Sequence, residues 1–197
     1  MQKIQAISYL AGLFGLLAGC PVAAQHLVAG YVVTAGGDSL RGAVRVAREP
    51  LDRQRQVRFV PLADRDRLRL GPAQVRAYGY VWGLDTVRYI SVAMPTGPAG
   101  LHPVFLRQLV NGPVQLYERY VALNGRGTAT SRREWLVGDA WQGLVSTYWW
   151  NFDKNAATFF RACPFLAADL QAGHYRARML PLIVRRYNGC GAAAPAP

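Results

Sequence analysis

Apolar and polar residues alternate over much of the segment from residue 27 to residue 147, and this pattern predicts short β-strands. Residues 28–34 are rich in side chains favoured in strands, and residues 39–46 alternate clearly between apolar and polar side chains. The sequence between them, Ala-Gly-Gly-Asp, is typical of a turn. This part of the chain therefore predicts a β-hairpin.

The same pattern recurs further along the chain. The predicted strands are residues 55–62, 75–82, 86–93, 104–110, 114–121, 133–137 and 142–147. Asn111 and Gly112 stand between two of them, and an Asn-Gly pair is a strong hairpin signal. Since the strands precede all predicted helices, we expect an α+β fold: a mostly antiparallel β-sheet or open barrel followed by a small C-terminal helical subdomain.

After residue 150 the apolar residues recur every three or four positions, which predicts helices. Asp153 suits an N-cap, and the first predicted helix runs from there to Ala162. Pro164 suits the first position of a second helix, which extends to about Ala172 and stops at Gly173. The apolar face of the first helix consists of Ala156, Phe159, Phe160 and Cys163.

A third helix is predicted from near Arg178, because this start keeps Pro181 in the first turn, where its missing N–H is tolerated. Gly189 is its predicted C-cap. The apolar stripe of this helix consists of Leu180, Ile183, Val184 and Tyr187.

Residues 1–24 are typical of a secretory signal peptide, with one positive charge at Lys3, an apolar run and small residues after it. The Val-Ala-Ala sequence before Gln25 fits ordinary cleavage. The Leu-Ala-Gly-Cys sequence that ends at Cys20 resembles the lipobox of bacterial lipoproteins, although Pro21 is unusual there. An uncleaved anchor is a third alternative, for which the apolar run is short. Either cleavage places the protein outside the cytoplasm.

These patterns divide the chain into four parts. They are the signal peptide (residues 1–24), a β-rich body (residues 25–147), a helical cap (residues 148–190) and a short tail (residues 191–197). The tail has little to bury and is expected to be disordered. No segment of the mature chain is long and apolar enough for a transmembrane helix.

After cleavage before Gln25 two cysteines remain, Cys163 and Cys190. An even number of cysteines in an oxidising compartment predicts a disulfide bond between them. The alternative is a redox-active or metal-binding pair. It lacks support, because the chain has no Cys-x-x-Cys motif and no histidine at ligand spacing to either cysteine.

Three segments resemble a family of secreted bacterial proteins of unknown function. They are GYVVTAGGDSLRGAV, FLRQLVNGPVQLYERY, and the C-terminal FFRACPFLAADLQAGHY with IVRRYNGC. The shared features are a Gly-Tyr hairpin, a central strand pair ending in Leu-Tyr, and a Cys-Pro helical end that closes with Tyr-Asn. The resemblance implies an architecture and export, and it implies no catalytic residues. This chain departs from the pattern in its excess of arginine over lysine and in Pro181.

The chain carries a formal net charge of +12, and removal of Lys3 with the signal peptide leaves +11. Such a basic protein can associate with anionic envelope components or with an envelope protein. Nucleic acid is not an expected partner, because an exported protein rarely meets it. The arginines between residues 45 and 69 are spread in a way typical of a solvated sheet face: Arg45, Arg48, Arg53, Arg55, Arg58, Arg65, Arg67 and Arg69.

The usual catalytic motifs are missing from the sequence. The three histidines, His26, His102 and His174, are far apart, and no His-Glu-x-x-His, Gly-x-Ser-x-Gly or glycine-rich phosphate loop is present. We therefore expect no catalytic residue and no cofactor.

Four carboxylates are candidates for metal binding or acid/base chemistry. Asp64 and Asp66 lack further oxygen ligands at loop spacing, so a solvated loop is favoured over a cation site and we expect no metal. Glu118 and Glu134 lie on or beside predicted strands. They would form an acid/base pair only if they faced each other.

Four aromatic residues, Trp141, Trp149, Trp150 and Phe152, lie where the predicted body meets the predicted cap. Such a cluster can be a binding surface for sugars or peptides. It can also be ordinary packing between two substructures, and the sequence leaves both interpretations open.

Together these features favour an exported, periplasmic or secreted, cell-envelope protein that acts as a non-enzymatic binding or structural module. A hydrolase without a recognisable motif, using scattered carboxylates, is one alternative. Another is an accessory lipoprotein of an outer-membrane complex, anchored through Cys20.

Overall fold

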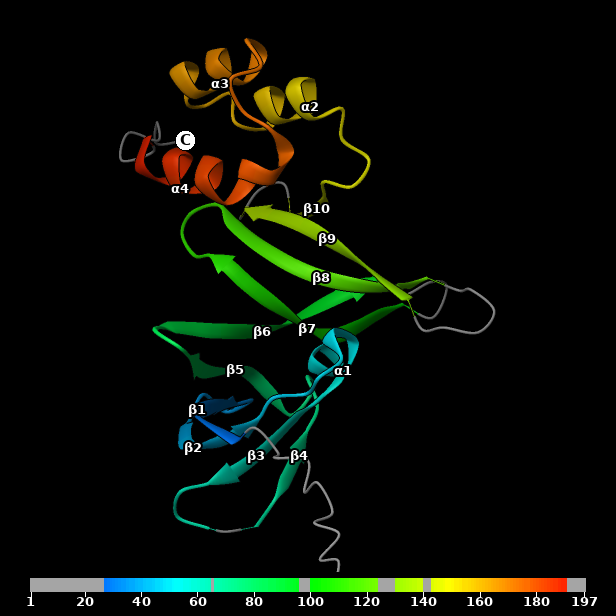
Figure 1. Ribbon diagram of the computed structural model, residues 1–197, viewed down its shortest axis with the longest axis vertical. Helices are drawn as coiled ribbons and strands as arrows, with labels where there is room; N and C mark the ends of the chain where they lie inside the picture. The colour runs from blue at the N-terminus through cyan, green and yellow to red at the C-terminus, as the bar shows by residue number, and fades with distance from the viewer. Residues whose placement is uncertain (1–26, 65, 96–99, 124–129, 140–142, 191–197) are drawn as a thin grey trace, which may run out of the picture.

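The computed structural model describes residues 27–64, 66–95, 100–123, 130–139 and 143–190 (Figure 1). The predicted signal peptide, Cys20, Trp141 and the predicted tail lie outside these residues. The described strands form one ten-stranded sheet in which neighbouring strands run antiparallel. The fold is therefore α+β with an open antiparallel sheet, and the predicted fold class is confirmed.

The chain begins in the interior of the sheet and adds strands on both sides. The strands are β1 (Leu27–Thr34), β2 (Ser39–Arg45), β3 (Val57–Pro61), β4 (Leu68–Leu70), β5 (Val75–Trp82), β6 (Asp85–Pro95), β7 (Leu101–Val110), β8 (Gln115–Leu123), β9 (Thr130–Asp139) and β10 (Gly143–Ser146). Their order in the sheet is β10-β9-β8-β7-β6-β5-β1-β2-β3-β4. After β4 the chain therefore returns to the free side of β1 and adds β5 to β10 one after another.

The predicted hairpin is formed by β1 and β2, and β5 has the predicted bounds. Strand β4 was not expected. It has only three residues, Leu68–Leu70, which are too few for an alternating pattern to stand out from the surrounding loop.

A short helix, α1 (Pro50–Arg55), interrupts the region in which only strands were expected. The predicted strand start at Arg55 is therefore wrong, and β3 begins at Val57. No residue of α1 is fully buried, so its sequence carries no apolar stripe. The local signals are weaker: a proline in the first turn, Asp52 beside it, and Arg53 in the last turn.

One face of the sheet, the inner face, carries the core beneath α1. Its buried residues include Val32, Val44, Phe59, Tyr78, Tyr80, Tyr89 and Phe105. The Tyr78 hydroxyl donates a hydrogen bond of 2.7 Å to the backbone oxygen of Arg53, which places α1 on this face. Successive strand residues point to opposite faces, so Arg45 and Arg58 point to the other, outer face.

Three helices and one 3-10 turn form the cap at one end of the sheet (Figure 1). They are α2 (Phe152–Phe159), α3 (Pro164–Gln171), η2 (Ala177–Met179) and α4 (Leu180–Cys190). The apolar residues predicted for the first and third helices are buried or half-buried in one cluster with Val110, Val114, Leu116 and Val137. The cap and the end of the sheet thus share a core. None of the described helices is long and apolar enough to cross a membrane.

The ends of α2 differ from the prediction. Asn151 is the N-cap, and Asp153 lies in the first turn, where its negative charge still favours the positive end of the helix. The helix ends at Phe159 and not at Ala162. Pro164 disfavours a helical conformation at Cys163, so a turn precedes α3. The predicted start of the second helix at Pro164 is confirmed.

The end of α4 also differs from the prediction. The helix starts at Leu180 and keeps Pro181 in its first turn, as expected, but it continues through Gly189 to Cys190. Gly189 is therefore not a C-cap. The sulfur atoms of Cys163 and Cys190 lie at bonding distance, with Cα atoms 6.0 Å apart. The predicted disulfide pair is confirmed, and it fixes the last residue of α4 to the start of α3.

Asn188 fastens the cap to the turn between β7 and β8. Its Nδ2 donates to the backbone oxygen of Val114 at 2.8 Å, and its Oδ1 accepts from the Val114 N–H at 3.0 Å. Gly112 in this turn has a φ of 152°, and a Cβ there would collide with the Asn188 side-chain amide. Tyr187 packs on Phe160 with ring centroids 5.1 Å apart. The Tyr-Asn pair of the resemblance is thus structural.

Candidate anion-binding site

Three arginines stand side by side on the outer face of the sheet. Arg45 of β2 is directly opposite Arg58 of β3, and Arg58 is directly opposite Arg69 of β4. Side chains that are directly opposite on neighbouring strands share a face, with Cβ atoms about 4.5–5.5 Å apart. We term these three residues the arginine row.

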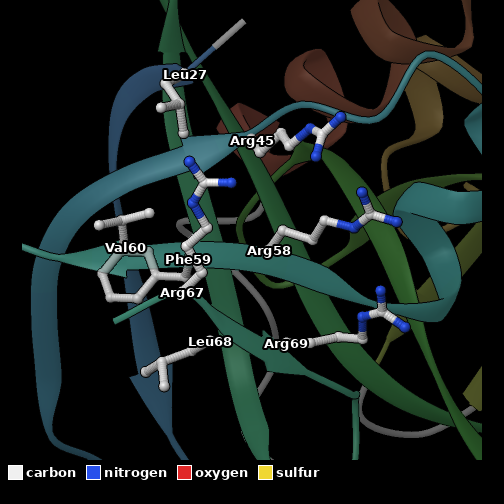
Figure 2. Close-up of a pocket in the computed structure, with 8 residues that line it drawn as sticks. All are labelled: Leu27, Arg45, Arg58, Phe59, Val60, Arg67, Leu68 and Arg69. Carbon is white, nitrogen blue, oxygen red and sulfur yellow. The ribbon is translucent and has the colours of Figure 1, made fainter. Parts of the chain in front are cut away.

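The arginine row borders a pocket of about 190 Å³. Figure 2 shows the three side chains extending in the same direction from neighbouring strands. Arg67 and Leu27 also line the pocket, so its lining combines four arginines with apolar side chains. Arg58, Arg67 and Arg69 are exposed, and Arg45 is half-buried. The row is therefore accessible to a ligand from solvent.

The arginine row has no acidic counterpart among the described residues. None of those that line the pocket is acidic, and none of their ion pairs or side-chain hydrogen bonds involves Arg45, Arg58 or Arg69. Like charges directly opposite in a sheet are destabilising. A guanidinium group presents a planar fork that matches two oxygens of a phosphate or carboxylate. An anion with several oxygens would therefore both fit the row and relieve its repulsion.

The structure refines the expectation of a solvated sheet face. The exposed arginines of the row fit it, but Arg53 and Arg55 belong to α1, and Arg65 lies outside the described residues. The sequence could not show that three of these arginines align, because β-strand register depends on pairing between strands.

Glu118 and Glu134 do not face each other. On the paired strands β8 and β9, Glu118 is opposite Trp135 and Glu134 is opposite Arg119. Since consecutive residues alternate between faces, the two carboxylates point to opposite sides of the sheet. The acid/base pair that the sequence left open is therefore wrong.

Both glutamates are held in ion pairs instead. Only 5% of Glu118 and 6% of Glu134 is exposed. Their partners are Arg107 at 3.2 Å and Arg133 at 3.6 Å for Glu118, and Arg119 at 2.8 Å and Arg132 at 2.6 Å for Glu134. Each carboxylate is thus neutralised by two arginines, which makes a structural role the simplest account.

Glu134 gives a testable dependence of stability on pH. Burial alone would raise the pKa of Glu134, but hydrogen bonds from Arg132 and Arg119 outweigh it and hold the pKa below its ordinary value of 4.5. The stabilisation is therefore complete above that value and is lost as the pH falls through the lower, folded pKa. Glu134→Gln is expected to cost about 1–2 kcal/mol at pH 7, and less at pH 3.

Urea unfolding of the wild type and of Glu134→Gln at both pH values checks this prediction. Asp85→Asn is the matched control, because Asp85 is exposed at the start of β6 and has no described ion pair. A stability difference that stays the same at pH 3 would show that the charge of Glu134 does not contribute.

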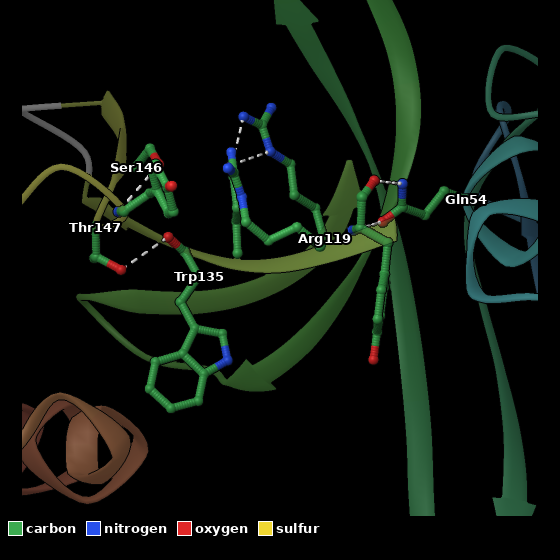
Figure 3. A network of polar contacts seen from close by, with 9 residues as sticks. Gln54, Arg119, Trp135, Ser146 and Thr147 are labelled. Atoms are coloured by element: carbon green, nitrogen blue, oxygen red, sulfur yellow. Dashed lines mark hydrogen bonds and ion pairs between the residues drawn. The ribbon is translucent and has the colours of Figure 1, made fainter. Parts of the chain in front are cut away.

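The aromatic cluster near the cap divides into two parts. Trp150 and Phe152 pack against the cap core, whereas Trp149 is 83% exposed. Trp149 forms an edge-to-face pair with Tyr148, with ring centroids 4.7 Å apart. The adjoining Thr147 is anchored to the backbone oxygen of Trp135 (Figure 3). Most of the described cluster is therefore packing.

The two described histidines, His102 and His174, lie on different parts of the fold. His102 is exposed on β7, and His26 lies outside the described residues. His174 lies 3.5 Å from Asp169, which also pairs with Arg186 at 3.6 Å. His174 is mostly exposed, just after α3. Within the described residues, no group of three potential metal ligands comes together.

The chain was compared with protein-family models, with curated proteins and with solved structures, and no match was found in any of the three. The resemblance to a family of secreted proteins therefore stays a prediction.

Proposed function

We propose that the protein is an exported, non-enzymatic binding module that holds a phosphate-bearing component of the cell envelope on the arginine row. The observation that carries this proposal is the alignment of Arg45, Arg58 and Arg69 on adjacent strands without an acidic partner among the described residues. The predicted signal peptide and the disulfide pair support export.

Phosphate suits the row better than a single carboxylate. A phosphate group is tetrahedral, so its non-bridging oxygens (two in a phosphodiester) point in different directions, and two neighbouring guanidinium groups can bind the same phosphate from either side. A row of three arginines then accommodates two phosphates, or one phosphate between either neighbouring pair of arginines. Such a site favours a surface or polymer that carries repeated phosphates over an isolated ion.

The proposal is tested by replacing the whole row. The variant Arg45→Gln/Arg58→Gln/Arg69→Gln is expected to bind vesicles of phosphatidylglycerol and phosphatidylcholine at least tenfold more weakly at low salt, since each surface arginine contributes about 1 kcal/mol. Cosedimentation with the vesicles measures the binding. Vesicles of phosphatidylcholine alone give the background, and polyphosphate in solution distinguishes a lipid headgroup from a free phosphate polymer.

A second triple variant controls for net charge. Arg176→Gln/Arg178→Gln/Arg185→Gln removes the same three charges from exposed positions of the cap. It is expected to retain most of the vesicle binding. If both triple variants lose binding equally, general electrostatics accounts for the association and the row is not a site.

The enzyme alternative receives no support from the carboxylates that suggested it, because Glu118 and Glu134 point to opposite faces and each is paired with arginines. Attachment through Cys20 remains compatible with the proposal. A lipid anchor at the N-terminus would bring the arginine row to a membrane surface and add to its affinity.

A further inference from the structure

A second, separate pocket lies on the inner face of the sheet. It has a volume of about 200 Å³ and is lined by Val46, Arg53, Tyr80, Trp82, Val87, Tyr89 and Arg107. Because Tyr80 and Tyr89 belong to the core of the inner face, whereas Arg45 and Arg58 point to the outer face, this pocket and the arginine row lie on opposite faces. Drug-sized ligands usually occupy at least about 300 Å³. The pocket is therefore suited to a small ligand with a single ring.

Arg53 is fixed in position before any ligand arrives. Its Nε donates to the backbone oxygen of Ala47 at 2.7 Å, and its Nη2 donates to that of Arg48 at 2.9 Å. Gln54 bonds to the backbone N–H and C=O of Tyr120 on β8, and Figure 3 shows it reaching that strand beside Arg119. The remaining donors of the guanidinium group are thus held in a defined place, which lowers the entropic cost of binding.

Arg107 adds a second positive charge. Its only described ion pair is with Glu118 at 3.2 Å, through Nη1, and Glu118 is shared with Arg133. A guanidinium group has five N–H donors, so several remain for a ligand. Of the described residues that line the pocket, none is acidic. The pocket therefore favours an anion.

Aromatic rings form the wall of the pocket. Tyr80 and Tyr89 line it, with ring centroids 6.4 Å apart and similar orientations. Tyr78 does not line the pocket but stacks on Tyr89, with centroids 4.7 Å apart. Burial raises the pKa of Tyr89 well above its ordinary value, so its hydroxyl stays neutral and does not offset the arginines. Trp82 is 52% exposed at the edge of the wall. An apolar ring face can therefore pack on the wall.

We propose that this pocket binds an acidic sugar, a single pyranose ring that carries a carboxylate. The carboxylate would bind between Arg53 and Arg107, and the ring would pack against Trp82. The phenol groups supply the polar partners that hydroxyl groups of a sugar need, which a purely apolar acid would not use.

Calorimetric titration of the mature protein with glucuronate tests the proposal. Glucuronate is expected to bind, whereas glucose, which lacks the carboxylate, is expected to bind at least tenfold more weakly. Cyclohexanecarboxylate has the charge and a ring without hydroxyl groups, and it is also expected to bind more weakly. Equal binding of cyclohexanecarboxylate and glucuronate would overturn the assignment to sugars, and equal binding of glucose would overturn the role of the arginines.

Two variants locate the site. Trp82→Ala is expected to weaken glucuronate binding about threefold to tenfold through lost stacking. The double variant Arg107→Gln/Glu118→Gln removes one charge of each sign together, so Glu118 is not left as a buried carboxylate without Arg107. It is expected to weaken binding about tenfold or more, the effect of losing a hydrogen bond to a charged group.

Trp149→Ala is the matched control, since Trp149 is exposed and lies outside the pocket. It is expected to bind glucuronate as the wild type does, and the thermal midpoints of all variants confirm that they are folded. Absence of glucuronate binding to the folded wild type, or equal weakening by Trp149→Ala and Trp82→Ala, would overturn the proposal.

Discussion

Serine in place of Cys190 is expected to lower the free energy of unfolding by about 3–4 kcal/mol. Cys163 and Cys190 are separated by 27 positions in the sequence, and in the chain-entropy model this loop constrains the unfolded chain by that amount. Cys190 is exposed, so the substitution removes little packing. Urea unfolding of both proteins without reductant measures the difference.

Two comparisons show whether the effect comes from the bond. Reduced wild type should be as unstable as Cys190→Ser, because both lack the bond. Cys163→Ser/Cys190→Ser should be less stable than the single variant, because Cys163 is buried in the cap core and a serine hydroxyl there is unfavourable. Equal stability of wild type and Cys190→Ser would contradict the prediction.

The intact mass, with and without reductant, also tells whether the chain starts at Gln25 or at an acylated Cys20.

The strands were largely predictable because their pattern is local. In β2, Val44 belongs to the buried inner-face cluster whereas Arg45 points to the outer face, so this strand alternates visibly along the chain. The turn with Gly112 was equally clear, because few residues other than glycine adopt its positive φ. Such signals do not depend on which strand pairs with which.

The strand order was not predictable, because it depends on contacts between distant segments. β1 pairs with β5, and no local pattern links these strands. Helix α1 is a similar case. It has no buried residue and is held by Gln54, which bonds to Tyr120 at a separation of 66 residues. The sequence of such a segment does not predict a helix by itself, and contacts with distant residues stabilise it.

The candidate sites show the same division. The sequence identified the arginines, yet only the pairing of β2, β3 and β4 brings Arg45, Arg58 and Arg69 into one row. The inner pocket was missed altogether, because Arg53 on α1 and Arg107 on β7 come from elements far apart in the sequence. The aromatic residues near the cap lie close together in the sequence where the body meets the cap, and of those described Trp150 and Phe152 pack against the cap core.

The second large expected effect is a loss of stability caused by a substitution in the core of the cap. Phe160→Ala is expected to lower the free energy of unfolding by about 3–5 kcal/mol, because it removes a fully buried aromatic ring and leaves a cavity. Phe160 has no exposed surface, and its ring lies 4.9 Å from Phe159 and 5.1 Å from Tyr187, measured between centroids. Its neighbours come from both α2 and α4, so the surrounding structure cannot easily collapse into the space. Urea unfolding measures the loss.

Phe165→Ala is the matched control for this prediction, because Phe165 lies in the same cap and is 83% exposed. It should change the stability by less than about 0.5 kcal/mol, as surface substitutions usually do.

Hydrogen exchange of Phe160→Ala then shows how far the loss of structure extends from the substituted residue. Since Tyr187 and Asn188 are adjacent on α4, loosening Phe160 should also expose the Val114 amide that Asn188 holds. If exchange becomes faster only in α2, the hydrogen bonds between Asn188 and the backbone of Val114 do not depend on the cap core.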